Sequence, residues 1–462
     1  MTGQLVFIAI LLISIIPFAY RVKKIRRNIL LGRDEDRSDR KGERWRVMGR
    51  VAIGQSKMVS RPIAGFFHIL IYAGFIIINL EVLEIILDGV LGTHRLFESL
   101  GGIYSALIAA FEILAALVFL ACVVFLIRRN ILKIRRFHLR EMSLWPKSDA
   151  NIILIWEIVL MGLFLTMNAA DGMLIAFGND PKSGLPPELQ HYKAQDMGHA
   201  FIVSQWIMPL LSDVGSLKTL AFIERFCWWG HIVGILGFLN YIPYSKHFHI
   251  FLAFPNTFYS DLDEEGKFDN LSSITQEVKL MMDPNADPFA GGGEEGGAEG
   301  EEEPDRFGAK DATDLTWKNL LDAYSCTECG RCSSVCPANQ TGKLLSPRKI
   351  MMDTRDRIEE VGKGIDKNGR DHDDGKALLG DYITQEELWA CTTCNACVEA
   401  CPVNIDPLSI IVDLRRFLVM EKSEVPEALA SMATNMENNG APWQFSPADR
   451  FNWAQEDDPS DR

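Results

Sequence analysis

The chain has 462 residues, 48% of them hydrophobic, and a formal net charge of −14 at pH 7. The charge is divided unevenly, because residues 1–254 carry 27 Lys and Arg against 19 Asp and Glu, whereas residues 255–462 carry 20 against 42. This division excludes a uniform soluble enzyme, a disordered chain and a nucleic-acid-binding protein. It indicates a basic membrane domain followed by an acidic soluble part.

Five apolar segments within residues 1–254 are long enough to cross a bilayer. About 20 helical residues suffice, since a helix rises about 1.5 Å per residue and the hydrocarbon layer is about 30 Å thick. A sixth apolar piece, residues 201–211, is about half that length, so an interfacial or re-entrant helix is expected there. The predicted spans are residues 4–20, 62–87, 103–127, 152–177 and 220–244.

Positive charge gathers in the loops on one side of the predicted bundle. Residues 21–61 contain 14 Lys and Arg, and residues 128–147 contain seven. The positive-inside rule then puts the N-terminus outside and the acidic half in the cytoplasm, and an odd number of spans agrees with this. We therefore predict a multi-pass protein of the bacterial inner membrane.

Histidines lie in or beside two of the predicted spans. His68 is near the cytoplasmic end of the second span, His231 is near the middle of the fifth, and His247 and His249 follow the fifth. An imidazole inside a bilayer is costly unless it is paired or bound to a metal, and a pair of histidines on facing helices commonly binds haem. The set predicts haem b; the alternative is a histidine that bonds a neighbouring helix.

Carboxylates also fall inside the predicted spans. Glu81 and Glu84 lie near the outer end of the second span, where water is within reach. Glu112 and Glu157 lie deeper in the third and fourth spans. Because carboxylates inside membranes often carry protons, Glu112 and Glu157 are the predicted groups for protonation of a quinone.

The acidic half contains eight of the ten cysteines, in two runs of the pattern Cys-x2-Cys-x2-Cys-x3-Cys-Pro. This is the spacing that binds [4Fe–4S] clusters, and the fourth cysteine of each run ligates the other cluster. Zinc is the alternative, but it usually uses Cys-x2-Cys pairs that lie far apart. One cluster is predicted on Cys326, Cys329, Cys332 and Cys401, and the other on Cys391, Cys394, Cys397 and Cys336.

Helical patterns flank both runs, and 65 residues separate them, which is wide for a compact βαβ ferredoxin. The predicted fold class is all-α, with a five-helix transmembrane bundle and an α-helical dicluster ferredoxin domain. Residues 283–305 are acidic and almost without apolar side chains, so a flexible linker is expected there. The predicted divisions are a membrane domain at 1–254, a connector at 255–314, the dicluster domain at 315–425 and a tail at 426–462.

Residues 315–418, above all ELWACTTCNACVEACP at 387–402, resemble the small iron–sulfur subunit of heterodisulfide reductases and the related subunit of anaerobic glycerol-3-phosphate dehydrogenase. The membrane half is similar to the cytochrome b subunits of membrane heterodisulfide reductase and respiratory nitrate reductase, through its five spans, His68 and residues 228–249. This resemblance implies one haem between His68 and His249, because Ile78 stands where a second histidine of that span is expected. His231 is the alternative to His249, and His247 is a weaker substitute.

The resemblance also implies a function. No adjacent cysteine pair of the CCG type occurs, so the catalytic partner is expected to be separate: a CCG-domain iron–sulfur subunit, an electron-transfer flavoprotein or another cytoplasmic dehydrogenase. We predict an electron-transfer subunit that connects this partner, two [4Fe–4S] clusters, haem b and menaquinone. The alternative is a cluster-bearing membrane anchor, without haem, of a flavin-dependent dehydrogenase of the succinate or glycerol-3-phosphate type. A transporter with an iron–sulfur sensor is disfavoured because the spans have no clear internal repeat.

Overall fold

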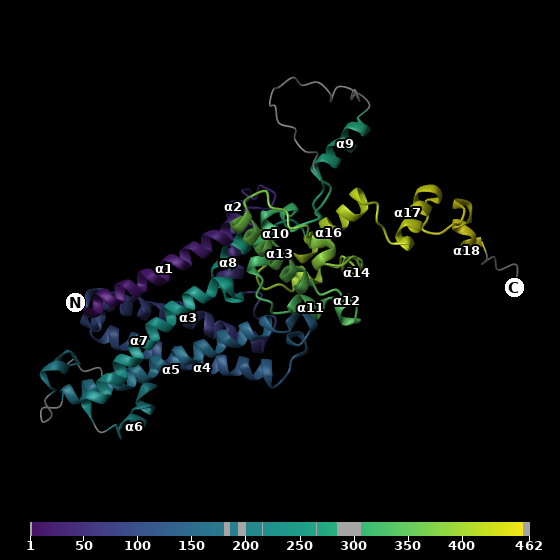
Figure 1. Cartoon of the computed structure of the whole chain (residues 1–462). Helices are drawn as coiled ribbons and strands as arrows, with labels where there is room; N and C mark the ends of the chain where they lie inside the picture. Colours follow the sequence, from purple (N-terminus) through teal and green to yellow (C-terminus); the bar gives the residue numbers. More distant parts are fainter. Residues whose placement is uncertain are drawn as a thin grey trace, which may run out of the picture.

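The computed structural model describes residues 2–179, 185–192, 200–214, 216–264, 266–283 and 306–455. Within these residues the chain is helical and has no β-strand, only two isolated bridges (Figure 1). The all-α prediction is therefore confirmed. The predicted linker lies outside the described residues, except for Asp283.

Five helices among the described residues are long and apolar enough to cross a membrane, which confirms the predicted number and marks the chain as a membrane protein. The apolar piece at 201–211 forms only a short turn (Ser204–Trp206) and the single-turn helix α6 (Met208–Leu211). The five long helices are α1 (Thr2–Ile29), α3 (Pro62–Leu91), α4 (Gly102–Asn130), α5 (Trp145–Asn179) and α7 (Leu217–Tyr241).

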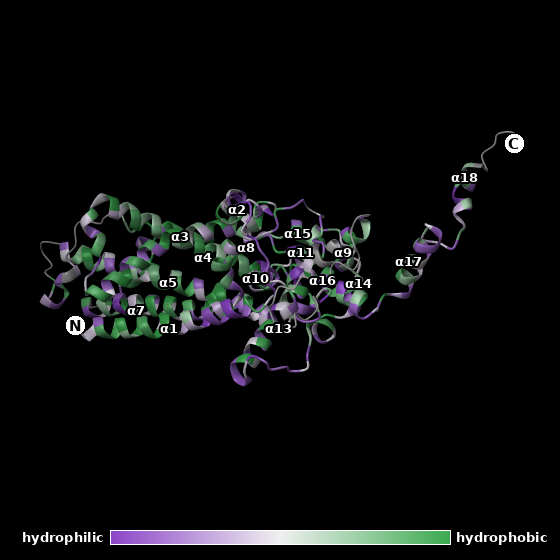
Figure 2. Cartoon of the chain, turned by 90° about the horizontal axis from the view of Figure 1, so that it is seen from above, coloured by the Kyte–Doolittle hydropathy of each residue, from purple (hydrophilic) through white to green (hydrophobic). Residues whose placement is uncertain are grey.

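The long helices pack as one bundle. Helix α5 lies against α4 and α7, α4 lies against α3, and α1 covers α3 and α7. Small residues permit this close approach: a Cβ on Gly74 would stand 2.5 Å from Val118. Apolar side chains such as Ile13 stay exposed on the outside, as a surface facing lipid requires, and Figure 2 shows this apolar bundle beside a more polar C-terminal part.

The C-terminal part consists of shorter helices around the two cysteine runs. We call residues 306–425 the cysteine domain. Some of its helices begin at side-chain caps; for example, the Asp406 side chain accepts hydrogen bonds from the backbone of Leu408 at 2.8 Å and Ser409 at 3.1 Å. The helices are α10 (Trp317–Ser325), α11 (Arg331–Val335), α12 (Pro337–Gln340), α13 (Pro347–Asn368), α14 (Gln385–Trp389), α15 (Ala396–Glu399) and α16 (Pro407–Arg416).

The remaining helices connect or extend these two parts. The domain boundary expected at residue 254 falls inside a single helix, α8, which follows the bundle. The tail extends away from the cysteine domain and leaves aromatic residues such as Trp443 and Trp453 exposed (Figure 1). These helices are α2 (Lys41–Met48), α8 (His249–Phe258), α9 (Ser272–Met282), α17 (Glu427–Asn439) and α18 (Asn452–Gln455).

The cysteine domain is docked firmly on the end of the bundle. Helix α1 continues beyond the bundle, and its Ile25 and Ile29 join the same apolar core as Leu320 and Ile358 of the cysteine domain. Beside them, the Asn28 amide donates to the Tyr324 hydroxyl at 2.9 Å. A shared core excludes water from the contact, so the two parts have one fixed arrangement rather than a loose tether.

A buried ion pair fixes the first cysteine run to the bundle. Glu328, between Cys326 and Cys329, is 4% exposed and accepts hydrogen bonds from Lys246, just after α7, and from Arg355 of α13. Burial alone would raise the pKa of Glu328, but Arg355 and Lys246 hold that pKa below its usual value. The carboxylate is therefore ionised when the domain is docked.

Glu328→Gln is expected to weaken this docking by about 3–5 kcal/mol, because removal of one partner leaves buried charge without compensation. Since the pKa of Glu328 is lowered in the folded protein, its stabilising effect is complete above about pH 4.3 and is lost as the pH falls through the folded value. Thermal unfolding and limited proteolysis between pH 3 and 7 measure this. The control is Glu399→Gln, whose exposed carboxylate is 3.7 Å from Lys57 and is expected to contribute less than about 1 kcal/mol.

Candidate functional site

The two cysteine runs fold alike although their intervening residues differ. Glu328 and Thr393 occupy the same position in the two runs and have positive φ angles of 54° and 53°. Gly330 and Asn395, two residues later, are again equivalent, with φ angles of 69° and 61°. These left-handed turns reverse the chain between successive cysteines, so that thiols close in sequence face one space.

The structure brings the fourth cysteine of each run to the other run. A small cavity is lined by Cys326, Cys329 and Cys332 of the first run and by Cys401 and Cys397 of the second. Around Cys397, burial raises the pKa of the thiol, and the negative charges of Asp406, Cys391, Cys336 and Cys394 raise it further. Cys336 therefore lies with the second run, and Cys401 lies with the first.

The donor set fits an iron–sulfur cube. Burial raises the pKa of both Cys326 and Cys401 to about 12, so these thiols ionise only next to strong positive charge, which bound iron supplies. Within the described residues, no group of three or more His, Cys, Asp or Glu is arranged to hold a single metal ion. In a [4Fe–4S] cube each cysteine thiolate binds a different iron. The four ligands of a cube therefore surround a volume and do not converge on one metal ion.

The two runs differ in their exposure. Cys394 of the second run is exposed and Cys391 is half-buried, whereas Cys326 of the first run is buried. Arg415 braces the second run through hydrogen bonds to the carbonyls of Leu388 and Cys391. The beginning of the second run, at Cys391 and Cys394, is thus the part nearest to solvent, whereas its Cys397 and Cys401 are buried.

A cavity of about 590 Å³ lies where the bundle meets the cysteine domain. Its volume falls in the range of about 300–1,000 Å³ that is typical of cofactor and ligand sites. Helices α3, α4, α5, α7 and α8 form its walls, and Thr327, Cys329 and Arg331 of the first run close one end. The same cavity is therefore lined both by the first cysteine run and by the interior of the bundle.

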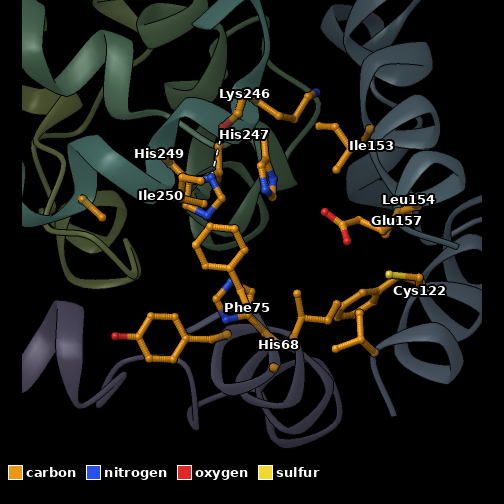
Figure 3. Close-up of a pocket in the computed structure, with 18 of the residues that line it drawn as sticks. His68, Phe75, Cys122, Ile153, Leu154, Glu157, Lys246, His247, His249 and Ile250 are labelled. Carbon is orange, nitrogen blue, oxygen red and sulfur yellow. Dashed lines mark hydrogen bonds between the residues drawn. The ribbon is translucent and has the colours of Figure 1, made fainter. Parts of the chain in front are cut away.

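Two histidines face each other across this cavity. His68 approaches from α3 and His249 from α8, with ring centroids 6.5 Å apart (Figure 3). An imidazole nitrogen binds a metal at about 2 Å, so two imidazoles on opposite sides of one metal have ring centres roughly 6 Å apart. At this spacing, His68 and His249 would hold one metal between them.

The hydrogen bonds of these two rings also suit metal ligands. Nδ1 of His249 lies 3.0 Å from the carbonyl of Lys246, which leaves Nε2 available, and ligating histidines usually have such a partner. The buried Nδ1 of His68 has no hydrogen-bond partner among the described residues, so this nitrogen is free to bind a ligand in the cavity. The residues present thus fit the predicted haem.

The two other predicted histidines lie differently. His231 lines the same cavity, but its Nδ1 lies 3.0 Å from the Leu160 carbonyl and its ring packs against Phe164. The Nδ1 contact of His231 is like that of His249 with the Lys246 carbonyl, so the partner ring separates the two: His249 faces His68, whereas His231 packs against Phe164. The His247 ring is perpendicular to that of His249 at 5.6 Å, and burial lowers the pKa of His247 to about 3.

The structure separates the predicted carboxylates. The Glu157 side chain points into the large cavity from α5 (Figure 3). Glu112 does not line it; instead Glu112 accepts hydrogen bonds from the backbone of Val203 at 2.8 Å and Ser204 at 3.1 Å. Glu112 therefore holds the segment that precedes α6 on the bundle.

The expectation that Glu81 and Glu84 reach water is wrong. Both are only 4% exposed. Glu84 accepts hydrogen bonds from the Tyr104 hydroxyl at 2.8 Å and from the backbone of Phe97 at 2.9 Å. Arg95, in the turn between α3 and α4, is buried and bonds Asp171 at 2.6 Å. The sequence held one signal for this polar network: Arg95 is the single Lys or Arg in the loop between the second and third predicted spans, and the second span contains Glu81 and Glu84.

Comparison with known proteins identifies the class of the chain. Residues 325–405 match the family described as 4Fe-4S dicluster domain, and this stretch contains all eight cysteines of the two runs. The chain carries a dicluster iron–sulfur domain, which is confirmed, and its relatives are iron–sulfur oxidoreductases. No solved structure gives a significant match to the chain.

Three relatives illustrate the likeness. The chain is 28% identical to a probable iron-sulfur-binding oxidoreductase FadF of Bacillus subtilis, over 98% of this chain and 61% of that protein. It is 26% identical to the EtfAB:quinone oxidoreductase of Syntrophomonas wolfei, over 97% of this chain and 59% of that protein. It is 38% identical to one subunit of a CoB-CoM heterodisulfide reductase of Methanosarcina acetivorans, over 23% of this chain and 53% of that protein.

These matches confirm the resemblance of the cysteine domain to heterodisulfide reductase subunits. The likeness of the membrane half to nitrate reductase subunits stays a prediction. The chain spans about three fifths of the length of its two long relatives.

Proposed function

We propose that the chain transfers electrons between a cytoplasmic redox partner and a quinone in the membrane, through two [4Fe–4S] clusters and one haem b. The observation that carries this proposal is the single cavity lined both by His68 and His249 and by Cys329 of the first cysteine run. A metal between the two histidines is thus next to a cluster held by that run. Haem and clusters supply one-electron chemistry when bound, and the protein fixes their positions.

The cysteine arrangement supports the proposed ligand sets and an order of transfer. Cys326, Cys329, Cys332 and Cys401 hold the cluster next to the haem, and Cys391, Cys394, Cys397 and Cys336 hold the cluster nearer the surface. Because Cys394 is exposed, the surface cluster meets the soluble partner. Electrons pass between partner and haem through both clusters in turn.

The names of the relatives support the partner and the quinone. The Syntrophomonas protein is called an EtfAB:quinone oxidoreductase, so we propose an electron-transfer flavoprotein as the soluble partner and menaquinone as the lipid-soluble one. A CCG-domain iron–sulfur subunit is the further partner that we propose. The loop charges support a cytoplasmic position for the cysteine domain.

Glu157 is the proposed proton carrier for the quinone, because its carboxylate faces the cavity that holds the haem ligands. Glu157→Gln keeps the shape of the side chain and removes the titrating group, so we expect quinol-linked turnover to fall by about 10²–10⁴-fold with haem and cluster contents unchanged. Glu112→Gln is the comparison. It is expected to lower the stability of the fold, because the hydrogen bonds of the Glu112 carboxylate are weakened, and to leave the turnover of each folded molecule unchanged. Equal turnover in Glu157→Gln and the unmodified protein would contradict this role.

The proposed function is tested by a reduced-minus-oxidised visible spectrum of protein purified without oxygen. A b-type α band that appears on addition of a menaquinol analogue would establish the haem and its connection to the quinone. Absence of the band, with about eight iron atoms per chain still present, would contradict the haem and leave a cluster-bearing membrane anchor.

A further inference from the structure

Two arginines stand at the rim of the large cavity, at the end nearest the first cysteine run. Arg129 is in the last turn of α4, and Arg136 is in the following loop. Both guanidinium groups stack on the ring of Phe137, with Cζ atoms 4.7 Å and 4.8 Å from the ring centroid. One aromatic ring thus holds two positive charges at the opening of the cavity.

Neither guanidinium forms a salt bridge among the described residues, although the charges of Glu328 and Asp149 act on Arg129 and that of Cys329 acts on Arg136. Nε and Nη2 of Arg129 and Nε of Arg136 are buried without a hydrogen-bond acceptor. The acids of this region are already engaged: Asp149 accepts the Tyr241 hydroxyl at 2.5 Å, and Glu328 is paired with Lys246 and Arg355. Buried guanidinium nitrogens without acceptors are unfavourable, so these three nitrogens are open to an acceptor other than the nearby Cys329 thiolate.

We propose that Arg129 and Arg136 bind the two propionate carboxylates of the haem seated between His68 and His249. This inference rests on the proposed function, since it requires that haem. All four residues line the same cavity, and the propionates are the only charged groups on the edge of the porphyrin. Guanidinium and carboxylate groups match in geometry and form two parallel hydrogen bonds. The phosphate of an anionic lipid offers similar chemistry, but it would not depend on the two histidines.

The first test is the double variant Arg129→Gln and Arg136→Gln in the full-length chain. We expect a lower ratio of haem to cluster iron and a more negative midpoint potential of the haem that remains, because a nearby positive charge favours the reduced iron. The control is Arg135→Gln, which removes the same charge from an exposed position in the same loop. The single variant Arg136→Gln gives a smaller shift in the same direction and serves if the double variant folds poorly.

The second test compares haemin with haemin dimethyl ester, which lacks the free carboxylates. Full-length protein is produced under haem limitation and titrated with each compound. The unmodified protein and Arg135→Gln are expected to bind the ester at least about tenfold more weakly than haemin, and the double variant is expected to bind both alike.

The outcomes separate this inference from the proposed function. The double variant could keep its haem content, its haem midpoint potential and its preference for haemin over haemin dimethyl ester. That result would overturn the propionate site and leave the proposed function standing. A loss of co-purified anionic lipid in the double variant, with the haem unaffected, would likewise overturn it in favour of a lipid headgroup. Absence of haem from the unmodified protein would overturn both proposals.

Discussion

His249→Ala is expected to remove the b-type absorption band, with haem content reduced by at least about tenfold. Even the hydrogen-bond partners of metal ligands are worth roughly 10–100-fold in metal affinity, and His249 is proposed as a ligand itself. His68→Ala is expected to have the same effect, because the His68 and His249 rings lie 6.5 Å apart and would together hold the haem iron. The measurement is the reduced-minus-oxidised spectrum, normalised to cluster iron.

His231→Ala is the matched control. It removes an imidazole from the same cavity, but one whose ring packs against Phe164 and does not face His68, so the band is expected to remain. Loss of the band in His231→Ala with its retention in His249→Ala would make His231 the ligand and would refute the proposed pair.

Cys401→Ala and Cys336→Ala are expected to remove different clusters, each lowering iron from about eight to about four atoms per chain. Cys401 lines the small cavity between the cysteine runs together with Cys326, Cys329 and Cys332. Cys401→Ala should therefore remove the cluster that borders the haem. In Cys336→Ala that cluster should remain. In Cys336→Ala the surviving cluster is therefore the one next to the haem. In Cys401→Ala the surviving cluster is the one nearer the surface, and it is separated from the haem.

Rapid-freeze electron paramagnetic resonance distinguishes them. After full reduction, a menaquinone analogue should reoxidise the surviving cluster quickly in Cys336→Ala and slowly in Cys401→Ala. Cys227→Ala, which removes a buried cysteine of α7 far from both runs in sequence, should keep eight irons and serves as the control. Reversal of the two rates would exchange the order of the clusters.

Much of the site follows from local features of the chain. The spacing within each cysteine run restricts which thiols face one space, because the connecting turns are only two or three residues long. The span lengths and loop charges likewise follow from the size of the bilayer and the cost of burying charge. For this reason the five helices and the dicluster domain were predictable before any contact was known.

Choices among equivalent residues were not predictable in this way. His231, His247 and His249 all had suitable positions, and only the packing of α8 against α2 and α10 places the His249 ring opposite His68. Glu112 and Glu157 were equally deep by sequence, yet Glu112 is taken up by the backbone of residues 203 and 204. The Glu84 carboxylate is held by the backbone of Phe97 in a short turn whose path the sequence pattern does not encode.

The sequence by itself determined which chemistry is available: two sets of cluster thiols, a histidine-bearing bundle and a basic loop surface. Tertiary structure alone decided how these parts meet, through the core shared by Ile25 of α1 and Leu320 of α10 and through the ion pair of Lys246 with Glu328. Such contacts join residues far apart in the chain, and their energy comes from burial and charge pairing that exist only once both surfaces are in place.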